Sequence, residues 1–576
     1  MFFKLNKYYR GYIAFAILCP LFMILEVFGD VLIPSLMEST IDNGVMNQNI
    51  DLVIKNGKYM ILVALLALFF GVVSTFFSAK AAQGFGANLR NDVFTKIQSF
   101  SFASLDQFEI SSLITRLTND IVFLSNLARM TLRIAVRAPV MFIMAIFMAI
   151  RINPKLSMIF AISLPIIAIG AFILMQVALP RFRKFQKSFD QVNNRTQENL
   201  MAIRVVKAFT REDYEVEKFE DKNNNLLVTS LHALNLIVLM MPLMMLVMFS
   251  IIISVFWFGG NLVLKGSMQA GELFSFTMYV GQILTSVINI SAYVINLSRA
   301  KVSVERILEV LNTEPEFADD NTYQLKEVKK GNVCFKDVSF KYPNTKHRSL
   351  RDINLEIEAG STTAIIGSTG SAKTTLVQLI SRLYDVTSGE ILIDNQPIDL
   401  YDPIALRDQV AMVLQENTLF SGTIRSNMQW GKEDATDEEI ITALKISQAA
   451  DFVLNRPEGL DSKVERGGAN FSGGQKQRLC IARTLLKNPK IIIFDDSTSA
   501  VDMQTEANIR EGLNKYNPSL TKIIIAQRIS SIQHANRIIV LDNGEVSGIG
   551  THEELLENNI IYREIYESQQ RGMMAE

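Results

Sequence analysis

Cysteine and net charge are both scarce in this sequence. Its 576 residues include three cysteines, Cys19, Cys334 and Cys480. Their spacing matches neither a disulfide framework nor a metal-ligand set, so we interpret them as reduced packing residues. The formal net charge is −1. This gives no excess of basic residues for a bulk polyanion, so no nucleic-acid partner is expected.

Charged residues are also few, at 20% of the chain, whereas hydrophobic residues make up 49%. This balance indicates a membrane-embedded part. Long uncharged runs lie almost entirely before residue 300, and each exceeds the roughly 20 residues that cross a bilayer as a helix. They cover residues 59–79, 156–180, 233–264 and 273–298.

Two further runs are weaker candidates for membrane spans. Residues 11–37 contain Glu26 and Asp30, and residues 138–150 are short unless the helix extends back through Arg133 and Arg137. Counting both, we predict six spans. The long loops after spans two and four are basic, which places them and both termini in the cytoplasm by the positive-inside rule. We therefore expect a multi-pass protein of the cell (plasma) membrane, in contact with membrane lipids.

The composition changes near residue 311 and again near residue 331. Residues 311–330 are polar, with Pro315 and the acidic pair Asp319 and Asp320, which is typical of a linker. Beyond them, short β-rich runs alternate with helical patterns, as in an α/β domain with a mostly parallel sheet. We predict a helical transmembrane domain at 1–310, a linker at 311–330 and an α/β phosphate-loop domain at 331–576.

A glycine-rich turn follows an apolar strand in "TTAIIGSTGSAKTTLVQLI" and leads into a helix. Backbone N–H groups of such a turn and the helix N-terminus cradle phosphates. Lys373 would reach the terminal phosphates and the Thr374 hydroxyl would ligate Mg²⁺. The predicted nucleotide-binding residues of this loop are Gly367, Ser368, Thr369, Gly370, Ser371, Ala372, Lys373, Thr374 and Thr375.

The loop departs from the usual G-x-x-x-x-G-K-[ST] pattern at one position. Ala372 stands where the pattern has its last glycine. The added methyl group is tolerable if φ is negative at this residue, and costly if φ is positive.

Other motifs accompany the phosphate loop in a fitting order. Asp495 ends the apolar strand "IIIFD" and is suited to hold Mg²⁺ through water, and Gln415 follows the strand "QVAMVL" and could reach the metal and the terminal phosphate. Tyr342 could stack on an adenine ring. The segment "FSGGQ" would begin a helix with a second anion-binding N-terminus. Its residues are Phe471, Ser472, Gly473, Gly474 and Gln475.

Together these motifs resemble the nucleotide-binding domain of ABC transporters, and with the preceding spans the whole chain resembles one half of an ABC exporter. The resemblance implies ATP and Mg²⁺ as ligands and a second half-subunit as partner. In such exporters each ATP lies between the phosphate loop of one half and the FSGGQ-type signature of the other. By the same resemblance, segments around 105–115 and 208–214 would be coupling helices that press on the nucleotide-binding domains.

Two positions differ from an active member of that family. Its catalytic glutamate corresponds to Asp496 and its switch histidine to Gln527. Glutamine neither takes nor gives a proton in the working pH range, and aspartate is one methylene shorter than glutamate. A misplacement of about 1 Å can cost roughly 10²-fold in rate. The combination resembles the degenerate-site half of heterodimeric bacterial ABC multidrug exporters, whose partner half would carry the consensus catalytic site.

Glu26 and Asp30 are four residues apart and share one face of the first predicted span. A charge at mid-membrane costs about 2.5–3.5 kcal/mol on insertion scales, so lipid exposure is disfavoured. Two interpretations remain open: a polar cavity wall that attracts cationic amphipathic substrates, or a fixed pairing with Arg133 or Arg137.

We expect a half-subunit of an ATP-driven exporter of hydrophobic compounds, with a poorly hydrolysing ATP site of its own and an intact signature for its partner's site. The alternatives are a lipid or lipopeptide exporter and an ATP-gated channel or sensor. A channel predicts passive conductance without hydrolysis, and a pump predicts uphill transport that stops with hydrolysis.

Overall fold

The computed structural model describes residues 2–314, 323–343, 345–497 and 501–574. The chain divides into two compact units. The first comprises residues 1–94 and 114–311, and the second comprises residues 95–113 and 312–576. Residues 95–113 therefore belong with the second unit although they lie within the first in sequence. Residues 315–322 of the predicted linker lie outside the described residues.

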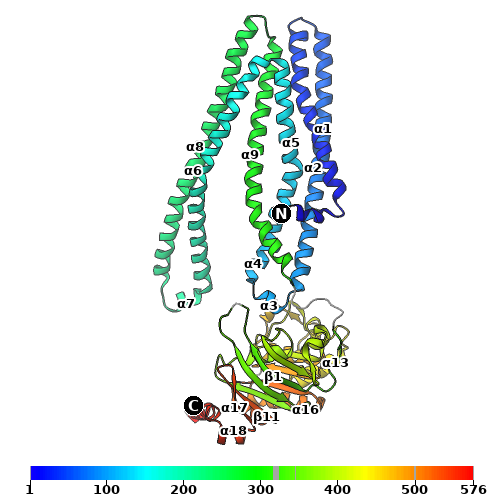
Figure 1. Cartoon of the computed structure of the whole chain (residues 1–576), viewed down its shortest axis with the longest axis vertical. Helices are drawn as coiled ribbons and strands as arrows, with labels where there is room; N and C mark the ends of the chain where they lie inside the picture. The colour runs from blue at the N-terminus through cyan, green and yellow to red at the C-terminus, as the bar shows by residue number, and fades with distance from the viewer. Residues whose placement is uncertain (1, 315–322, 344, 498–500, 575–576) are drawn as a thin grey trace. The chain divides into compact units, whose positions relative to one another are not determined.

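Long helices build the first unit, and several run antiparallel to one another (Figure 1). The helices α6 and α8 form a pair joined by the short helix α7. The bounds are η1 (Phe2–Tyr9), α1 (Ile13–Ser39), η2 (Thr40–Val45), α2 (Ile50–Gln98), α4 (Ile110–Thr115), η3 (Arg116–Asp120), α5 (Ile121–Ile152), α6 (Pro154–Met201), α7 (Ile203–Ala208), α8 (Glu212–Leu264) and α9 (Ala270–Asn312).

Five helical stretches of the described chain are long and apolar enough to cross a membrane. They are Ile13–Val45, Ile50–Gln98, Ile110–Ile152, Met245–Leu264 and Ala270–Asn312. The fourth predicted span lies in α6, where a shorter apolar helix, Pro154–Ile167, is found. Several side chains between 168 and 175 lie outside the description, so the sixth span stays a prediction. The third span does extend back through Arg133 and Arg137, because α5 begins at Ile121.

Polar contacts near the turn between α8 and α9 fix α9 against α1 and η2. The Asp42 carboxylate accepts hydrogen bonds from the backbone N–H groups of Gly271 at 2.6 Å and Glu272 at 3.1 Å. A carboxylate in this position satisfies the free N–H groups of the first turn and complements the helix dipole. Deeper in the unit, the buried Tyr279 hydroxyl donates to the Val31 carbonyl at 2.8 Å.

The second unit contains a six-stranded sheet and a four-stranded sheet. The first has the order β12-β11-β3-β10-β9-β6, parallel except for the edge strand β12, and the second is antiparallel with the order β2-β1-β4-β5. The strands are β1 (Val333–Phe340), β2 (Leu350–Ile357), β3 (Thr362–Gly367), β4 (Ser388–Ile393), β5 (Gln396–Pro397), β6 (Val410–Val413), β7 (Gly422–Thr423), β8 (Lys463–Val464), β9 (Ile491–Asp495), β10 (Thr521–Ile525), β11 (Arg537–Asp542) and β12 (Glu545–Gly550).

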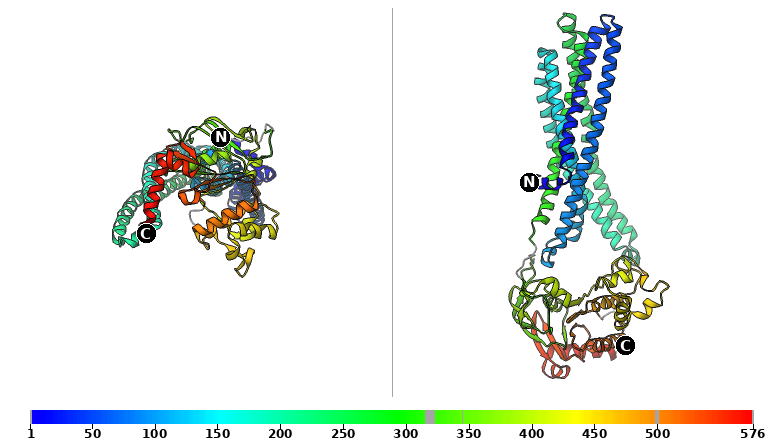
Figure 2. Two further views of the ribbon diagram at one scale, coloured as in Figure 1. Left: turned by 90° about the horizontal axis from the view of Figure 1, so that it is seen from below. Right: turned by 90° about the vertical axis from the view of Figure 1, so that its right-hand side faces the viewer.

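Helices cover these sheets, and α19 runs along the lower edge of the second unit in the right-hand view of Figure 2. The helices are α3 (Phe102–Leu105), α10 (Lys373–Ile380), α11 (Pro403–Gln409), α12 (Ile424–Met428), α13 (Asp437–Ile446), α14 (Ala450–Leu454), α15 (Gly473–Leu485), α16 (Met503–Tyr516), α17 (Ile529–Ile532), α18 (His552–Asn558) and α19 (Ile560–Met574).

The six-stranded sheet aligns three strand ends that carry the predicted site. In β9 the run Ile491–Asp495 is buried at every position, as expected for a central parallel strand covered on both faces. In the parallel register, Ile525 of β10 pairs with Asp495 of β9 on one side and with Ile365 of β3 on the other. The loops after β3, β9 and β10 therefore emerge at the same edge, where ligands bind in open α/β sheets.

Short helices lie in or next to the two predicted coupling segments. The first, around 105–115, follows α3 and includes α4. Ala103 packs in the same hydrophobic cluster as Phe340 and Tyr384 of the second unit, which explains why residues 95–113 group with it. In the second segment, around 208–214, the short helix α7 lies earlier than predicted and ends at Ala208.

Candidate nucleotide site

The phosphate loop joins the buried strand β3 to α10 and wraps around the Lys373 ammonium group. Lys373 Nζ donates to the carbonyl of Gly367 at 2.9 Å and to that of Ser368 at 2.8 Å. Burial lowers the pKa of Lys373, while the nearby Asp496 and Asp495 carboxylates raise it. The two carbonyl bonds hold the ammonium group inside the loop, where a bound phosphate would find a fixed positive charge.

Gly367 and Ala372 mark the two ends of this loop, and both depart from ordinary backbone conformations. Gly367 has φ +158, and a Cβ atom there would lie 2.0 Å from the Leu541 carbonyl oxygen, so the close approach requires glycine. Ala372 has φ 69 and ψ 26, a left-handed conformation. An L-residue with a Cβ atom pays roughly 1–2 kcal/mol in this region. The sequence left open whether φ at Ala372 is negative, where a methyl group is tolerable, or positive, where it is costly. The structure shows the positive, costly case.

Thr374 and Asp495 supply oxygen atoms for a metal at the end of β9. Thr374 Oγ1 donates to Asp495 Oδ1 at 2.9 Å, and the exposed Gln415 lines the same cavity. Burial, followed by the neighbouring Asp496, raises the pKa of Asp495, and the hydrogen bond from Thr374 lowers it. An all-oxygen set with few carboxylates fits Mg²⁺, which keeps several waters and shares phosphate ligands.

Asp496 and Gln527, which the sequence predicts to stand at the catalytic-base and switch positions, contact each other. Gln527 Nε2 donates to Asp496 Oδ2 at 2.7 Å. Burial raises the pKa of Asp496, and the Gln527 hydrogen bond lowers it. Asp496 itself has φ 49, a left-handed conformation that aspartate tolerates better than most residues.

A cavity of about 460 Å³ joins these groups. The phosphate loop forms one wall, and the ends of β9 and β10 form another. Predicted residues that line the cavity are Thr369, Gly370, Ser371, Ala372, Lys373, Thr374, Thr375, Gln415, Asp495, Asp496 and Gln527. Its position and its single lysine in a glycine-rich turn fit the triphosphate end of a nucleotide.

Sequence reasoning missed four residues that also line this cavity: Arg348, Ser349, Ile525 and Asn543. Asn543 has φ 47 and lies in the turn between β11 and β12. The Asn-Gly pair at 543–544 was a readable turn signal. Only the sheet order, which puts β11 beside β3, brings that turn to the phosphate loop.

Tyr342, the predicted adenine-stacking residue, lies beside the loop but does not line the cavity. Its hydroxyl is 3.0 Å from Thr375 Oγ1 and donates to Gln378 Oε1 at 3.3 Å. Its ring packs edge-on against Phe340 and Tyr384, and burial raises its pKa. These contacts hold the aromatic ring next to α10, so the adenine role stays a prediction.

The signature residues form the start of α15 and do not line this cavity. Ser472 is the N-cap: its side chain accepts from the Gln475 N–H at 3.3 Å, and the Gln475 side chain accepts from the Ser472 N–H at 3.1 Å. This capping box fixes a helix N-terminus. Phe471 is buried, whereas Ser472 and Gly473 are exposed. The geometry leaves the anion-binding end of α15 open for a ligand outside the chain's own nucleotide cavity.

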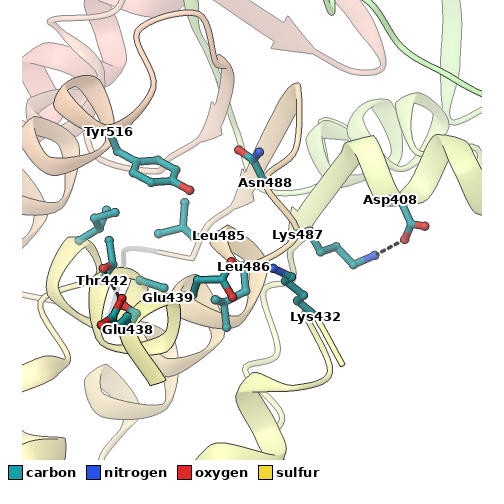
Figure 3. A pocket seen from close by; sticks show the side chains of 13 residues that line it. Asp408, Lys432, Glu438, Glu439, Thr442, Leu485, Leu486, Lys487, Asn488 and Tyr516 are labelled. Atoms are coloured by element: carbon teal, nitrogen blue, oxygen red, sulfur yellow. Dashed lines mark hydrogen bonds and ion pairs between the residues drawn. The ribbon is translucent and has the colours of Figure 1, made fainter. Parts of the chain in front are cut away.

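A second cavity of the same unit, about 750 Å³, is lined by two lysines that are each paired with a carboxylate (Figure 3). Lys432 Nζ lies 2.6 Å from Glu439 Oε1, and Lys487 Nζ lies 3.2 Å from Asp408 Oδ1. The cavity shares no lining residue with the phosphate-loop cavity. Its lysines are neutralised and its described lining contains no glycine-rich turn, so the smaller cavity is the candidate nucleotide site.

Glu26 and Asp30, the predicted substrate-cavity residues, line a cavity of about 700 Å³ in the first unit. Arg137 contacts both: its guanidinium is 2.8 Å from Asp30 Oδ2 and 3.5 Å from Glu26 Oε1. The structure therefore shows the predicted pairing of these two carboxylates with Arg137. Among the described residues, Glu26 Oε2 and Arg133 Nε are buried without a hydrogen-bond partner, and both residues line the cavity.

Family comparisons agree with this organisation. The sequence family described as the ABC transporter transmembrane region matches residues 16–287, and the family described as ABC transporter matches residues 350–499. The first match covers most of the helical unit, and the second covers the phosphate loop, the signature and β9.

Whole-length relatives and a solved structure extend the likeness to both units. The chain is 38% identical to the "Uncharacterized ABC transporter ATP-binding protein YfiB" of Bacillus subtilis over 98% of each chain. It is 36% identical to the similarly named Rv1273c of Mycobacterium tuberculosis, over 98% of this chain and 97% of that one.

A structure of "a bacterial Atm1-family ABC exporter with ATP bound" shares the fold with a TM-score of 0.82, at 24% identity, over 98% of this chain and 99% of that one. The two family regions follow each other in this order, and the relatives match along nearly their full length. Together these findings identify the family. The chain belongs to the ABC transporters and has the fold of an exporter half-transporter, with one transmembrane region followed by one nucleotide-binding domain.

Proposed function

We propose that this chain is one half of a heterodimeric ATP-driven exporter in the cell membrane. Its own nucleotide site binds Mg·ATP and hydrolyses it slowly, and its signature helix completes the faster site of a partner half-transporter. The transported compounds are hydrophobic or amphipathic small molecules. The hydrogen bond between Gln527 and Asp496 is the observation that carries this proposal.

The binding machinery supports tight nucleotide binding at the chain's own site. Lys373 is held in the phosphate loop, and Thr374 lies within hydrogen-bond distance of Asp495. When Mg·ATP is bound, Lys373 would neutralise the terminal phosphates, and Thr374 would contribute an oxygen to the metal. These residues need no glutamate or histidine to act, so binding is separable from hydrolysis.

The chemistry of residues 496 and 527 supports slow hydrolysis. A positioned general base is worth roughly 10²–10⁴-fold in rate. The Asp496 carboxylate is shorter than the family's glutamate, and one of its oxygens already accepts from Gln527 at 2.7 Å. Gln527 can donate and accept hydrogen bonds but cannot carry a positive charge. The pair therefore orders the site without supplying a strong base or a charged switch residue.

The signature helix supports a role at the partner's site. Ser472 and Gln475 form a complete capping box, so the N-terminus of α15 is held in a defined conformation. The free N–H groups and dipole of such a terminus favour a terminal phosphate. Gly473 and Gly474 let that phosphate approach the backbone closely.

The cavity beside Glu26 supports an amphipathic substrate. Apolar side chains from α1 and α2 form most of its wall, together with Glu26, Asp30 and Arg133. Gly71 keeps space for the Glu26 carboxylate, because a Cβ atom at residue 71 would lie 3.1 Å from its carboxyl carbon. With Asp30 bonded to Arg137, Glu26 Oε2 is left as a buried acceptor without a hydrogen-bond partner, which supports a role for Glu26 toward a donor group on a substrate.

The test compares two substitutions in the purified, assembled pair. Ser472→Arg places a bulky cation at the signature and should nearly abolish ATPase activity and transport, since preorganised donors are worth about 10²–10³-fold each. Asp496→Asn should reduce both only modestly. Equal damage by the two substitutions would show that the Asp496 site is the catalytic one, and the assignment of slow hydrolysis to this chain would then be wrong.

A further inference from the structure

The C-terminal helix α19 holds the backbone around Gln527 by a single side chain, Gln569. Gln569 Nε2 donates to the Gln527 carbonyl at 2.7 Å, and Gln569 Oε1 accepts from the Ile529 N–H at 2.9 Å. The Gln569 amide thus forms hydrogen bonds with the backbone of Gln527 and of Ile529, the residues on either side of Arg528. A side-chain amide has an N–H donor and a C=O acceptor like those of a peptide group. It can therefore take the place of a backbone hydrogen-bond partner for this segment.

The segment that Gln569 contacts lies between two regular elements. The strand β10 ends at Ile525, and α17 begins at Ile529 with no side-chain cap from Arg528. The first N–H groups of a helix need an acceptor from outside the helix. Gln569 supplies that acceptor for Ile529.

The helix that carries Gln569 is itself firmly seated. Tyr562 of α19 is fully buried in a hydrophobic cluster that also contains Ala526 and Ile529, the residues flanking this segment. The Tyr562 hydroxyl lies 2.7 Å from His552 Nδ1. Tyr562 lies about two helical turns before Gln569, so α19 is anchored close to the residue that contacts the loop.

We propose that Gln569 is a positioning residue for the switch position of the nucleotide site. It holds the backbone so that Gln527 reaches Asp496 and faces the cavity where the terminal phosphate would lie. Loss of Gln569 frees the Gln527 side chain and shortens the time that ATP stays in this chain's own site. This inference rests on the proposed retention of ATP at that site.

The first measurement needs no nucleotide. Amide hydrogen exchange is followed in the full-length nucleotide-free chain for Gln569→Leu, which removes both bonds at similar volume. We expect exchange of the Ile529 amide to rise up to about 10-fold, as loss of one hydrogen bond predicts. Gln569→Glu keeps an acceptor and should leave this amide protected. The matched control Gln570→Leu, which removes a bond to the Tyr566 hydroxyl on the same helix, should leave Ile529 unchanged.

The second measurement is the release rate of labelled ATP from this chain's site in the assembled transporter. We expect Gln569→Leu to speed release roughly 5-fold in the wild-type background. In a Gln527→Ala background the same substitution should change release less than about 2-fold, because the side chain it positions is gone. Equal acceleration in both backgrounds would mean that Gln569 only stabilises the domain, and the positioning role would be wrong.

The outcomes separate this inference from the proposed function. If wild-type protein releases ATP from its two sites at equal rates, the slow-site proposal fails. In that case the effect of Gln569→Leu on the ATP release rate can still be compared between the wild-type and the Gln527→Ala backgrounds. If Ile529 exchange is unaffected by Gln569→Leu, the positioning role fails whatever the nucleotide sites do.

Discussion

Gln527 Nε2 lies 2.7 Å from Asp496 Oδ2, so the two residues predicted to stand at the switch and catalytic-base positions are hydrogen-bonded partners. They come from the ends of neighbouring parallel strands, β10 and β9. The amide supplies a neutral donor to the carboxylate. The pair is thus internally satisfied, which suits a site that holds its ligand rather than one that turns over quickly.

Restoring both residues of this pair should restore hydrolysis at this site. We expect Asp496→Glu combined with Gln527→His to raise its ATPase rate about 10²-fold, since a placed base is worth roughly 10²–10⁴-fold. The measurement is steady-state ATPase of a heterodimer whose partner site has lost its own catalytic base. Each single substitution should give a smaller gain. An unchanged rate in the double variant would show that other residues limit this site.

Ala372→Gly should stabilise the nucleotide-binding domain. Ala372 has φ 69, and the left-handed conformation costs alanine roughly 1–2 kcal/mol. After the larger entropy loss of glycine, we expect a net gain of about 0.5–1 kcal/mol in the free energy of unfolding. Denaturant unfolding of the full chain in detergent measures it. Ala405→Gly, inside the helix α11, is the control and should lose about 1 kcal/mol.

Tyr384→Phe should weaken the coupling between ATP hydrolysis and transport. The Tyr384 hydroxyl donates to Asp106 Oδ2 at 2.7 Å, just after α3, and its ring packs against Tyr342. We expect the stimulation of ATPase by transported compounds to fall about fivefold, as loss of roughly 1 kcal/mol predicts, while the basal rate stays within twofold.

A matched control for Tyr384→Phe is Tyr401→Phe. The buried Tyr401 hydroxyl donates to the Ile393 carbonyl at 3.0 Å, within the second unit and away from α3. It should lower thermal stability without changing the stimulation ratio. If both variants change that ratio equally, the effect comes from general stability, and no special role of Tyr384 is needed.

Glu26→Gln and Asp30→Asn should have different consequences. Asp30 lies 2.8 Å from the Arg137 guanidinium, so Asp30→Asn leaves a poorly compensated charge and should reduce the yield of assembled protein. Glu26 is 3.5 Å from Arg137 and has an unpartnered oxygen beside the cavity. Glu26→Gln should spare assembly and lower export of cationic compounds more than neutral ones. Equal export losses for both classes would favour a purely structural role.

The sequence alone determined the chemistry of the nucleotide site. The glycine-rich turn with Lys373 and Thr374, the acid ending "IIIFD" and the helix start at FSGGQ are local patterns, because each depends on residues adjacent in the chain. The same holds for the apolar runs of the membrane part. Local sequence also predicted that Asp496 and Gln527 depart from the family's catalytic pair, but it predicted no distance between them.

Tertiary structure decided the relationships between distant segments. The sheet order brings β9 and β10 together and so makes Gln527 a partner of Asp496. Gly367 comes so close to the Leu541 carbonyl of the neighbouring strand β11 that a Cβ atom would not fit there. Gln569 reaches the Gln527 carbonyl across 42 residues of sequence. No periodicity or motif encodes such contacts, because they arise from packing of whole elements, whose free energy is shared among many residues.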